Sequence, residues 1–126
     1  MVEEIIDGKL TLNQPAGHLE AGESLVEAVI REAQEETAWL FQPESLTGIY
    51  RWQLPNSDDT YIRYCFTGQA IEHYSDQSLD SDIEQAVWLT YEQLDTRQNE
   101  MRSPLVLACL NDYLLGHRYP LTLLHD

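Results

Sequence analysis

Four short segments of the 126-residue chain have the residue patterns of β-strands. In the first, apolar and polar residues alternate, as they do in a strand with one buried face. The other three are rich in β-branched and aromatic residues. Two of the segments flank the polar run 55–59, an arrangement typical of a β-hairpin. The four predicted strands are residues 9–13, 46–54, 60–70 and 85–90.

A helical period of apolar positions begins immediately after Ser24. Ser24 and Glu27 have the spacing of a capping box, in which each side chain binds the backbone N–H of the other residue. We therefore predict a helix from Ser24 to about Trp39, which is stopped near Pro43. Its predicted apolar face consists of Leu25, Ala28, Val29 and Ala33.

Two more helices are predicted in the C-terminal third of the chain. A short one starts at residues 91–94. A longer amphipathic one covers residues 103–115, with Pro104 in its first turn and Gly116 just past its end. Strands and helices thus interleave, and no repeat, low-complexity tract or linker interrupts them. The sequence predicts a single α/β domain over residues 1–126.

The charge of the chain is strongly one-sided. Twenty-two acidic residues stand against seven basic ones, so the formal net charge is −15, and Lys9 is the only lysine. Such a surface repels nucleic-acid polymers and anionic membranes, and we expect neither as a partner. It would also repel a small phosphorylated substrate, unless bound divalent cations invert the local potential. Phosphate chemistry on this chain is therefore expected to be metal chemistry.

Neither a membrane anchor nor a thiolate metal site is expected. No apolar run approaches the ~20 residues that cross a bilayer, and residues 1–10 lack the apolar core of a signal peptide. Cys65 and Cys109 lie far apart in the sequence and outside any Cys/His cluster. These features favour a cytoplasmic protein.

Acidic residues gather on the first predicted helix and just before it. Glu32, Glu35 and Glu36 fall at positions i, i+3 and i+4, so their carboxylates are expected to converge on one patch. Arg31 is the only nearby residue that could neutralise them. Mg²⁺ or Mn²⁺, which prefer oxygen ligands, would relieve this repulsion and create a site for phosphate oxygens. The alternative is that these residues are simply the solvated face of a surface helix.

The spacing of these residues favours the metal site. The stretch from Gly17 to Trp39 reads GHLEAGESLVEAVIREAQEETAW. It resembles the Nudix box at every charged position, whereas the consensus has glycine where this chain has Ala38, at the end of the helix. The resemblance implies an α/β/α sandwich with a central mixed sheet, in which the box forms a catalytic loop–helix–loop that holds divalent ions.

The resemblance also assigns roles to individual residues. Glu32, Glu35 and Glu36 would be the metal ligands, and Glu32 is our first choice for the general base that activates water. Arg31 would pair with Glu23 and fix the geometry of the carboxylates. Gly17 would let the backbone approach the site closely, with a carbonyl around residues 16–17 completing the coordination.

Outside the box, three segments are similar to a bacterial Nudix subgroup, and together with the box they extend the resemblance over nearly the whole chain. Members of that subgroup are broad phosphatases of nucleoside tri- and diphosphates and of hydroxymethylpyrimidine pyrophosphate. The family usually has a further strand upstream of the segment that corresponds to Val2–Glu4, so we expect this chain to lack that first strand, or its sheet to begin late. The three segments are residues 13–20, 102–106 and 118–121.

Several residues outside the box are candidates for contact with substrate or metal. Glu84 could supply a distal carboxylate to the metal, or it could belong to a polar loop. Arginines are scarce here and could bind substrate phosphate, although Arg63 and Arg118 could equally pair with surface carboxylates. Aromatic side chains on the predicted hairpin could stack against a base or pyrimidine ring, or pack across strands. The substrate-binding candidates are Arg63, Arg102, Arg118 and Gly17, and the aromatic ones are Tyr50, Trp52, Tyr61 and Tyr64.

The leading hypothesis is therefore a Mg²⁺-dependent hydrolase of small phosphoanhydrides, acting as a monomer or homodimer. The alternative is a catalytically silent Nudix-fold module that binds a nucleotide or a protein. The complete set of Arg31, Glu32, Glu35 and Glu36 favours the enzyme, because silent modules commonly lose one of these carboxylates. A calcium-binding helical protein is excluded, because no D-x-D-x-D-G loop with a terminal glutamate is present.

Overall fold

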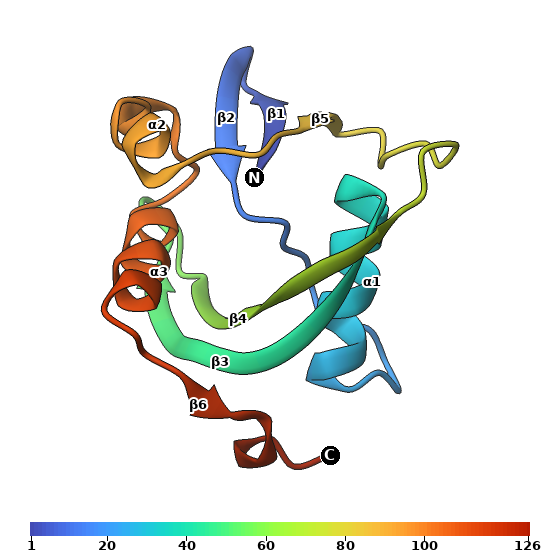
Figure 1. The fold of residues 1–126 in the computed structure, drawn as a ribbon. Helices are drawn as coiled ribbons and strands as arrows, with labels where there is room; N and C mark the ends of the chain where they lie inside the picture. The colour runs from blue at the N-terminus through green and yellow to red at the C-terminus, as the bar shows by residue number, and fades with distance from the viewer.

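The computed structural model describes all of residues 1–126, and β-strands and helices interleave along the chain (Figure 1). The strands are β1 (Val2–Ile6), β2 (Lys9–Asn13), β3 (Trp39–Gln53), β4 (Thr60–His73), β5 (Ile83–Ala86) and β6 (Tyr119–Pro120). The α-helices are α1 (Leu25–Thr37), α2 (Tyr91–Asp95) and α3 (Leu105–Leu114), and two 3₁₀ turns are η1 (Gln98–Glu100) and η2 (Leu121–Leu123). The predicted α/β class is confirmed.

The strands form two three-stranded sheets. In the first, β1 lies between β2 and β5, and in the second, β3 lies between β4 and β6. All strand pairs are antiparallel, and an isolated parallel bridge joins Leu12 of β2 to Met101. Helix α1 packs against β3 and β5 and so joins the two sheets, while α3 packs on β3. Figure 1 shows the long β3–β4 hairpin curving beneath the space between these two helices.

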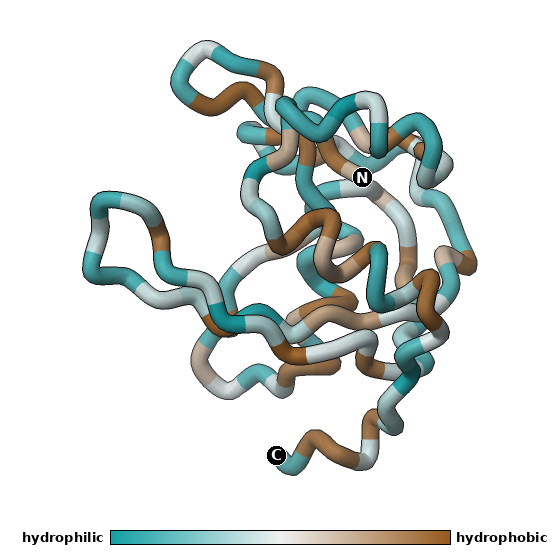
Figure 2. Tube along the Cα trace, turned by 90° about the vertical axis from the view of Figure 1, so that its left-hand side faces the viewer, coloured by the Kyte–Doolittle hydropathy of each residue, from teal (hydrophilic) through white to brown (hydrophobic).

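The core is formed by residues from both sheets and from α3. The largest side chains that are almost completely buried are Val2, Leu12, Leu46, Thr47, Val106 and Cys109. In Figure 2, hydrophobic stretches run through the middle of the molecule and also occur near the C-terminus, whereas the loop that projects furthest is mostly hydrophilic. Burial of apolar side chains from β1, β2, β3 and α3 therefore holds the two sheets together.

The start of α1 agrees with its prediction, but its end does not. Ser24 is the N-cap, and both hydrogen bonds of the capping box with Glu27 are present. The helix ends at Thr37, before the predicted Trp39, because Ala38 adopts a left-handed conformation with φ of 59°. The backbone of Trp39 then continues directly as β3.

Strand β3 is longer than the strand that the sequence predicts at residues 46–54. The β3–β4 hairpin is confirmed, but β3 begins at Trp39 and runs through Pro43, whereas the sequence predicted a helix that stops near Pro43 and a strand that begins at residue 46. The strand accommodates this proline because its pairing is irregular between Pro43 and Ser45, where a ladder N–H is dispensable. Opposite it lies Gly68, where a Cβ would overlap the backbone of Gln42, so only glycine allows this close approach.

The predicted strand at 85–90 is wrong in its boundaries, because β5 covers Ile83–Ala86. Its limits follow from its partner: β5 pairs with β1, and the pairing ends where Met1 and Val87 exchange hydrogen bonds. The sequence analysis did not predict β1 at all, although β1 is the central strand of its sheet. The expected short helix corresponds to α2, and the expected helix at 103–115 corresponds to α3.

Candidate metal and phosphate site

The candidate site lies where the loop between β2 and α1 returns along the helix (Figure 1). The Ala16 N–H donates a hydrogen bond to Glu36, and the His18 carbonyl accepts one from Arg31. Between them, Gly17 lies so close to Glu32 that a Cβ at this position would overlap the Glu32 carboxylate. Three consecutive loop residues thus contact three side chains of α1, so loop and helix form one unit.

Arg31 is the centre of this unit. Its Nε and Nη2 donate to the two carboxylate oxygens of Glu23 at 2.6 and 3.0 Å. Its Nη1 donates to Glu32 at 2.7 Å and to Glu35 at 3.1 Å. The hydrogen bonds from Arg31 lower the pKa of Glu23 to about 2. The same contacts, that with Glu23 first, raise the pKa of Arg31 further above its ordinary value. Arg31 therefore fixes three carboxylates at once.

Glu36 is held differently, because it has no arginine partner. Its side chain is buried and accepts a hydrogen bond of 3.0 Å from the Ala16 N–H. Burial raises the pKa of Glu36 to about 8, against the opposing effect of the Ala16 bond, and the charges of Glu32, Glu4 and Asp80 raise it further. Ionisation of Glu36 is therefore disfavoured while no positive charge lies beside its carboxyl.

The three predicted metal ligands do not form a ready-made cluster. No group of three or more His, Cys, Asp or Glu side chains in the structure is assembled closely enough to hold a metal ion. Glu32 and Glu35 accept hydrogen bonds from Arg31, whereas Glu36 accepts one from the backbone of the loop. The donors nevertheless suit a hard divalent cation, since all are carboxylate oxygens and the single charge of Arg31 does not balance them.

The predicted distal carboxylate, Glu84, makes no contact with the candidate ligands on α1 through a hydrogen bond or ion pair. Glu84 is exposed on β5, and its side chain makes no hydrogen bond or ion pair. The acidic residues that act on Glu36 from other elements are Glu4 of β1 and Asp80, and Asp82 in turn acts on Glu4. Sequence reasoning missed Glu4 because its place beside α1 depends on β1, which was not predicted.

The three arginines that the sequence singles out occupy different environments. Arg63 of β4 donates to Gln14 at 3.0 Å and to Asn13 at 3.2 Å, so it lies against the segment that leads into the box. Arg102 follows η1 and acts on the Glu4 carboxyl, partly offsetting the burial that raises the pKa of Glu4. Arg118 binds the carbonyls of Tyr113 and His117 and lies over the Tyr113 ring, at the C-terminal end of α3.

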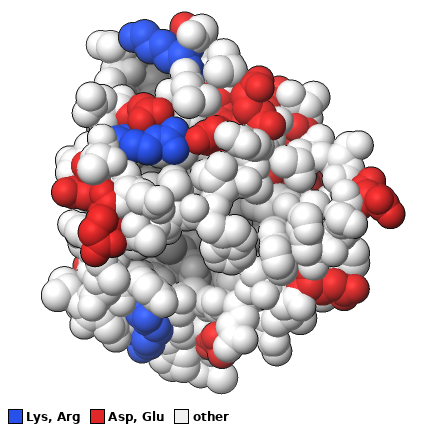
Figure 3. All heavy atoms as spheres, turned by 45° about the horizontal axis from the view of Figure 1, so that its top comes forward, with Lys and Arg blue, Asp and Glu red and all other residues white.

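The surface reflects the composition. On the face drawn in Figure 3, acidic side chains outnumber basic ones, as a net charge of −15 requires. No helix of this chain has both the length and the apolar character that a membrane span needs.

Comparison with known proteins relates this chain to one family. Residues 4–108 match the NUDIX domain. The chain is 40% identical over 126 residues to "Phosphatase NudJ" of Escherichia coli (strain K12) and equally to that of Shigella sonnei (strain Ss046). These matches cover all of this chain and 81% of each relative.

A solved structure matches over almost the whole fold. It is a NUDIX hydrolase from Nitrosomonas europaea, with a TM-score of 0.95 and 46% sequence identity. The match covers 99% of this chain and 85% of the other. The expected Nudix α/β/α architecture is thereby confirmed.

Proposed function

Because this chain belongs to the Nudix hydrolase family, we propose that it is a Mg²⁺-dependent enzyme, active also with Mn²⁺, that hydrolyses phosphoanhydride bonds in small substrates. One observation carries the proposal. Arg31 binds Glu23, Glu32 and Glu35 together, and it supplies only one positive charge to a helix face that also carries the buried Glu36. A divalent cation would supply the missing charge, and its preferred ligands are the oxygens present here.

In this proposal, Glu32, Glu35 and Glu36 hold the cation. When bound, such a cation activates water and neutralises charge that develops on the phosphoryl oxygens. Glu23 binds Arg31 through both carboxylate oxygens, and Arg31 in turn orients Glu32 and Glu35. These two residues therefore act by positioning the ligands.

Glu32 is the proposed general base. Its Oε1 accepts the hydrogen bond from Arg31, which leaves Oε2 to accept the proton of the attacking water. Gly17 supports this role, because its missing side chain lets the loop backbone lie against the Glu32 carboxylate. A larger residue at position 17 would displace Glu32 from both Arg31 and the loop.

We assign phosphate binding chiefly to Arg63 and Arg102. The Arg63 guanidinium donates to the neutral amide oxygens of Asn13 and Gln14 and forms no ion pair with a carboxylate, so its charge is not cancelled. Arg118 contributes less in this scheme, because its donors bind carbonyls at the end of α3. The proposed substrates are nucleoside di- and triphosphates or hydroxymethylpyrimidine pyrophosphate, in keeping with the relatives named as phosphatases.

The competing function is a Nudix-fold module that binds a nucleotide or a partner without hydrolysis. The complete Glu23–Arg31 pair, together with Glu32, Glu35 and Glu36, favours the enzyme, since binding alone does not need this set. The proposal further includes a cytoplasmic location and a monomeric or homodimeric state. The free thiols of Cys65 and Cys109 are consistent with the first of these.

Metal removal tests the proposal. Phosphate release from ATP, ADP and hydroxymethylpyrimidine pyrophosphate is measured with Mg²⁺, with Mn²⁺ and in excess EDTA. We expect release from at least one of these substrates with a divalent cation and none above background in EDTA, with recovery when Mg²⁺ is restored. Hydrolysis that continues undiminished in EDTA would contradict the metal assignment. Binding of these nucleotides without any hydrolysis would favour the silent module.

A further inference from the structure

The inner face of the β3–β4 hairpin carries an ordered row of side chains. The strand register pairs Trp52 with Tyr61 and Tyr50 with Arg63. Residues two apart on a strand point to the same face, so these four side chains share one face of the hairpin. The intervening residues occupy the opposite, outer face, which is largely exposed; they include Ile49, Arg51, Ile62 and Tyr64.

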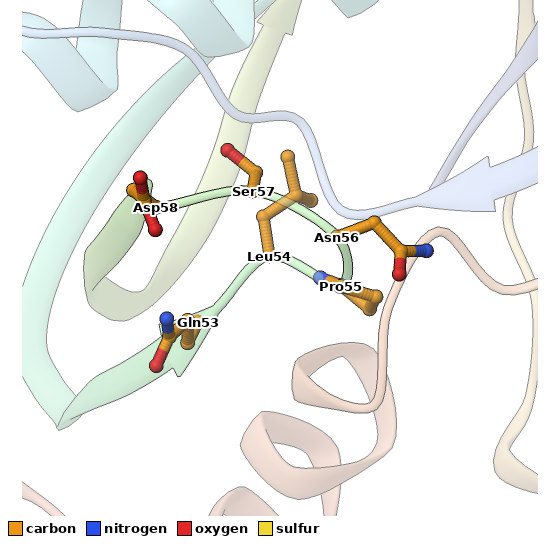
Figure 4. A pocket seen from close by; sticks show the side chains of 6 residues that line it. All are labelled: Gln53, Leu54, Pro55, Asn56, Ser57 and Asp58. Atoms are coloured by element: carbon orange, nitrogen blue, oxygen red, sulfur yellow. The ribbon is translucent and has the colours of Figure 1, made fainter.

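The cover over this inner face becomes thinner toward the hairpin turn. The Tyr50 hydroxyl is tied to Asp112 of α3 by a 2.8 Å hydrogen bond, and Arg63 is tied to Asn13 and Gln14. Further along, Tyr61 has an exposed fraction of 39% although it lies on the inner face. Beyond it, residues 53–58 of the turn line an open hollow of about 580 Å³ (Figure 4).

Three aromatic rings form a stacked row at this thinly covered end. The Trp52 and Tyr61 ring centroids are 6.1 Å apart with an interplanar angle of 27°. The Tyr61 and His18 centroids are 6.2 Å apart with an angle of only 12°. The His18 carbonyl also accepts a hydrogen bond from Arg31. The row is therefore connected directly to the candidate metal site.

Packing among the rings themselves does not account for the row. A cross-strand aromatic pair that serves the core is buried, whereas Tyr61 and His18 are both exposed. The middle ring of the row also lies beside a cation that has no carboxylate partner, since Arg63 is two residues from Tyr61 on the same face. That spacing is about 7 Å along the strand. A planar ring and a phosphate group of one small molecule can span it.

We propose that Tyr61, with Trp52 and His18, stacks against the aromatic ring of the substrate while Arg63 binds its phosphate. The inference rests on the proposed function and names the residues that would bind the planar ring of its proposed substrates. Stacking accepts any base, because every base presents a π-face. The Tyr61 ring therefore increases the affinity for the substrate without selecting one particular base.

The test compares two tyrosines on opposite faces of β4. Tyr61→Leu removes the inner ring, Tyr61→Phe keeps it, and Tyr64→Leu makes the same change on the outer face at a nearly equal exposure of 37%. The substrates are ATP, CTP and inorganic tripolyphosphate, which has no ring. We expect Tyr61→Leu to lower kcat/KM for ATP and CTP about 5- to 100-fold, the range of a lost base–aromatic stack. Tyr61→Phe keeps the ring and should retain more activity on ATP and CTP than Tyr61→Leu. Tyr64→Leu should change kcat/KM for ATP and CTP by less than about 2-fold, and rates on tripolyphosphate should be affected equally little in the Leu variants.

Equal losses on nucleotides and tripolyphosphate, or equal losses in Tyr61→Leu and Tyr64→Leu, would overturn the stacking role. A binding titration separates this outcome from failure of the proposed function. Its probe is the methylene-bridged analogue of ADP, which cannot be cleaved at that bridge. If nothing is hydrolysed but Tyr61→Leu alone weakens binding of the analogue, the hydrolase proposal fails and the ring site stands. If nucleotides are hydrolysed but Tyr61→Leu changes nothing, the ring site fails and the hydrolase proposal stands.

Discussion

Two arginines of this chain, Arg31 and Arg97, make nearly the same local contacts, yet the regions around them are built for different purposes. Each binds one carboxylate through two donors, Glu23 in the first case and Glu100 in the second. Their side chains are also almost equally exposed, at 22% and 23%. Pair geometry alone therefore does not distinguish them.

The number and origin of the carboxylates do distinguish them. Arg31 faces an excess of acid that comes from one loop and one helix within a short stretch of sequence. Within 4.0 Å its guanidinium meets Glu20, Glu23, Glu32 and Glu35.

Arg97 meets only two carboxylates, and one of them belongs to Glu3 of β1, 94 residues away. Glu3 is buried and is further satisfied by Gln85 of β5 at 2.7 Å. The Arg97 region thus holds distant elements together, whereas the Arg31 region concentrates negative charge on one loop and one helix, where we propose a metal site.

The sharpest way to break this comparison is to remove Arg31. In Arg31→Ala, turnover should fall about 10- to 100-fold, the range for changes to groups that orient metal ligands. The fold should suffer less, because Glu23, Glu32 and Glu35 remain accessible to water. Melting temperature and turnover are measured together, with Arg51→Ala as a control that removes the same charge from an exposed, unpaired position. A large loss of stability with nearly normal turnover would reduce Arg31 to a structural role.

Removing Arg97 should have the opposite profile. Arg97→Ala leaves the buried Glu3 carboxylate with only the Gln85 amide, so the free energy of unfolding should fall by about 1–3 kcal/mol. Turnover per folded molecule should stay within about 2-fold of the parent, because no proposed ligand changes. Denaturant unfolding measures the change in stability, and kinetics corrected for the fraction of active protein measure the turnover. Loss of turnover in fully folded Arg97→Ala would erase the distinction between the two arginines.

A smaller effect concerns the end of α1, behind the carboxylates. Ala38 has φ of 59°, which costs a residue with a Cβ about 1–2 kcal/mol relative to its ordinary conformations. In Ala38→Gly this strain disappears, but the loss of one buried methyl group costs about 0.8 kcal/mol. We expect a net gain of about 0.5 kcal/mol in the free energy of unfolding from these two contributions.

The control for Ala38→Gly is Ala33→Gly, in the interior of α1, which should instead lose about 2 kcal/mol, about 1 kcal/mol from helix propensity and about 0.8 kcal/mol from its own buried methyl group. If both glycine variants are destabilised equally, backbone strain at Ala38 does not contribute. This pair of variants changes no charge, so it isolates the scaffold of the Arg31 region from its electrostatics.

The same contrast between local and distant contacts explains what the sequence could predict. The capping box of Ser24 and Glu27 depends on residues close in the chain, and their spacing predicts it. The pairing of Arg31 with Glu23 is equally local, and the resemblance to the Nudix box implied it. The hairpin followed equally from the polar turn at 55–59.

Features that depend on distant partners escaped prediction. The sequence of β1 does not predict a central strand. Val2 and Glu3 are buried only because β2 and β5, which come later in the chain, pair with β1 on its two sides. For the same reason Glu4 was missed and the exposed Glu84 was preferred. Among the hairpin aromatics, only the strand register showed that Tyr61 faces the site and Tyr64 faces away.

The most direct test of the central claim is the Mg²⁺-dependent change in melting temperature of three proteins. They are the parent, Glu35→Gln in the proposed metal site and Glu44→Gln, an exposed carboxylate on β3. A cation that binds only the folded chain stabilises it by RT ln(1 + [L]/Kd). We predict that Mg²⁺ raises the melting temperature of the parent and of Glu44→Gln equally, and that of Glu35→Gln much less. Equal Mg²⁺ stabilisation of all three proteins would contradict the account and make the acidic side of α1 an ordinary solvated helix face.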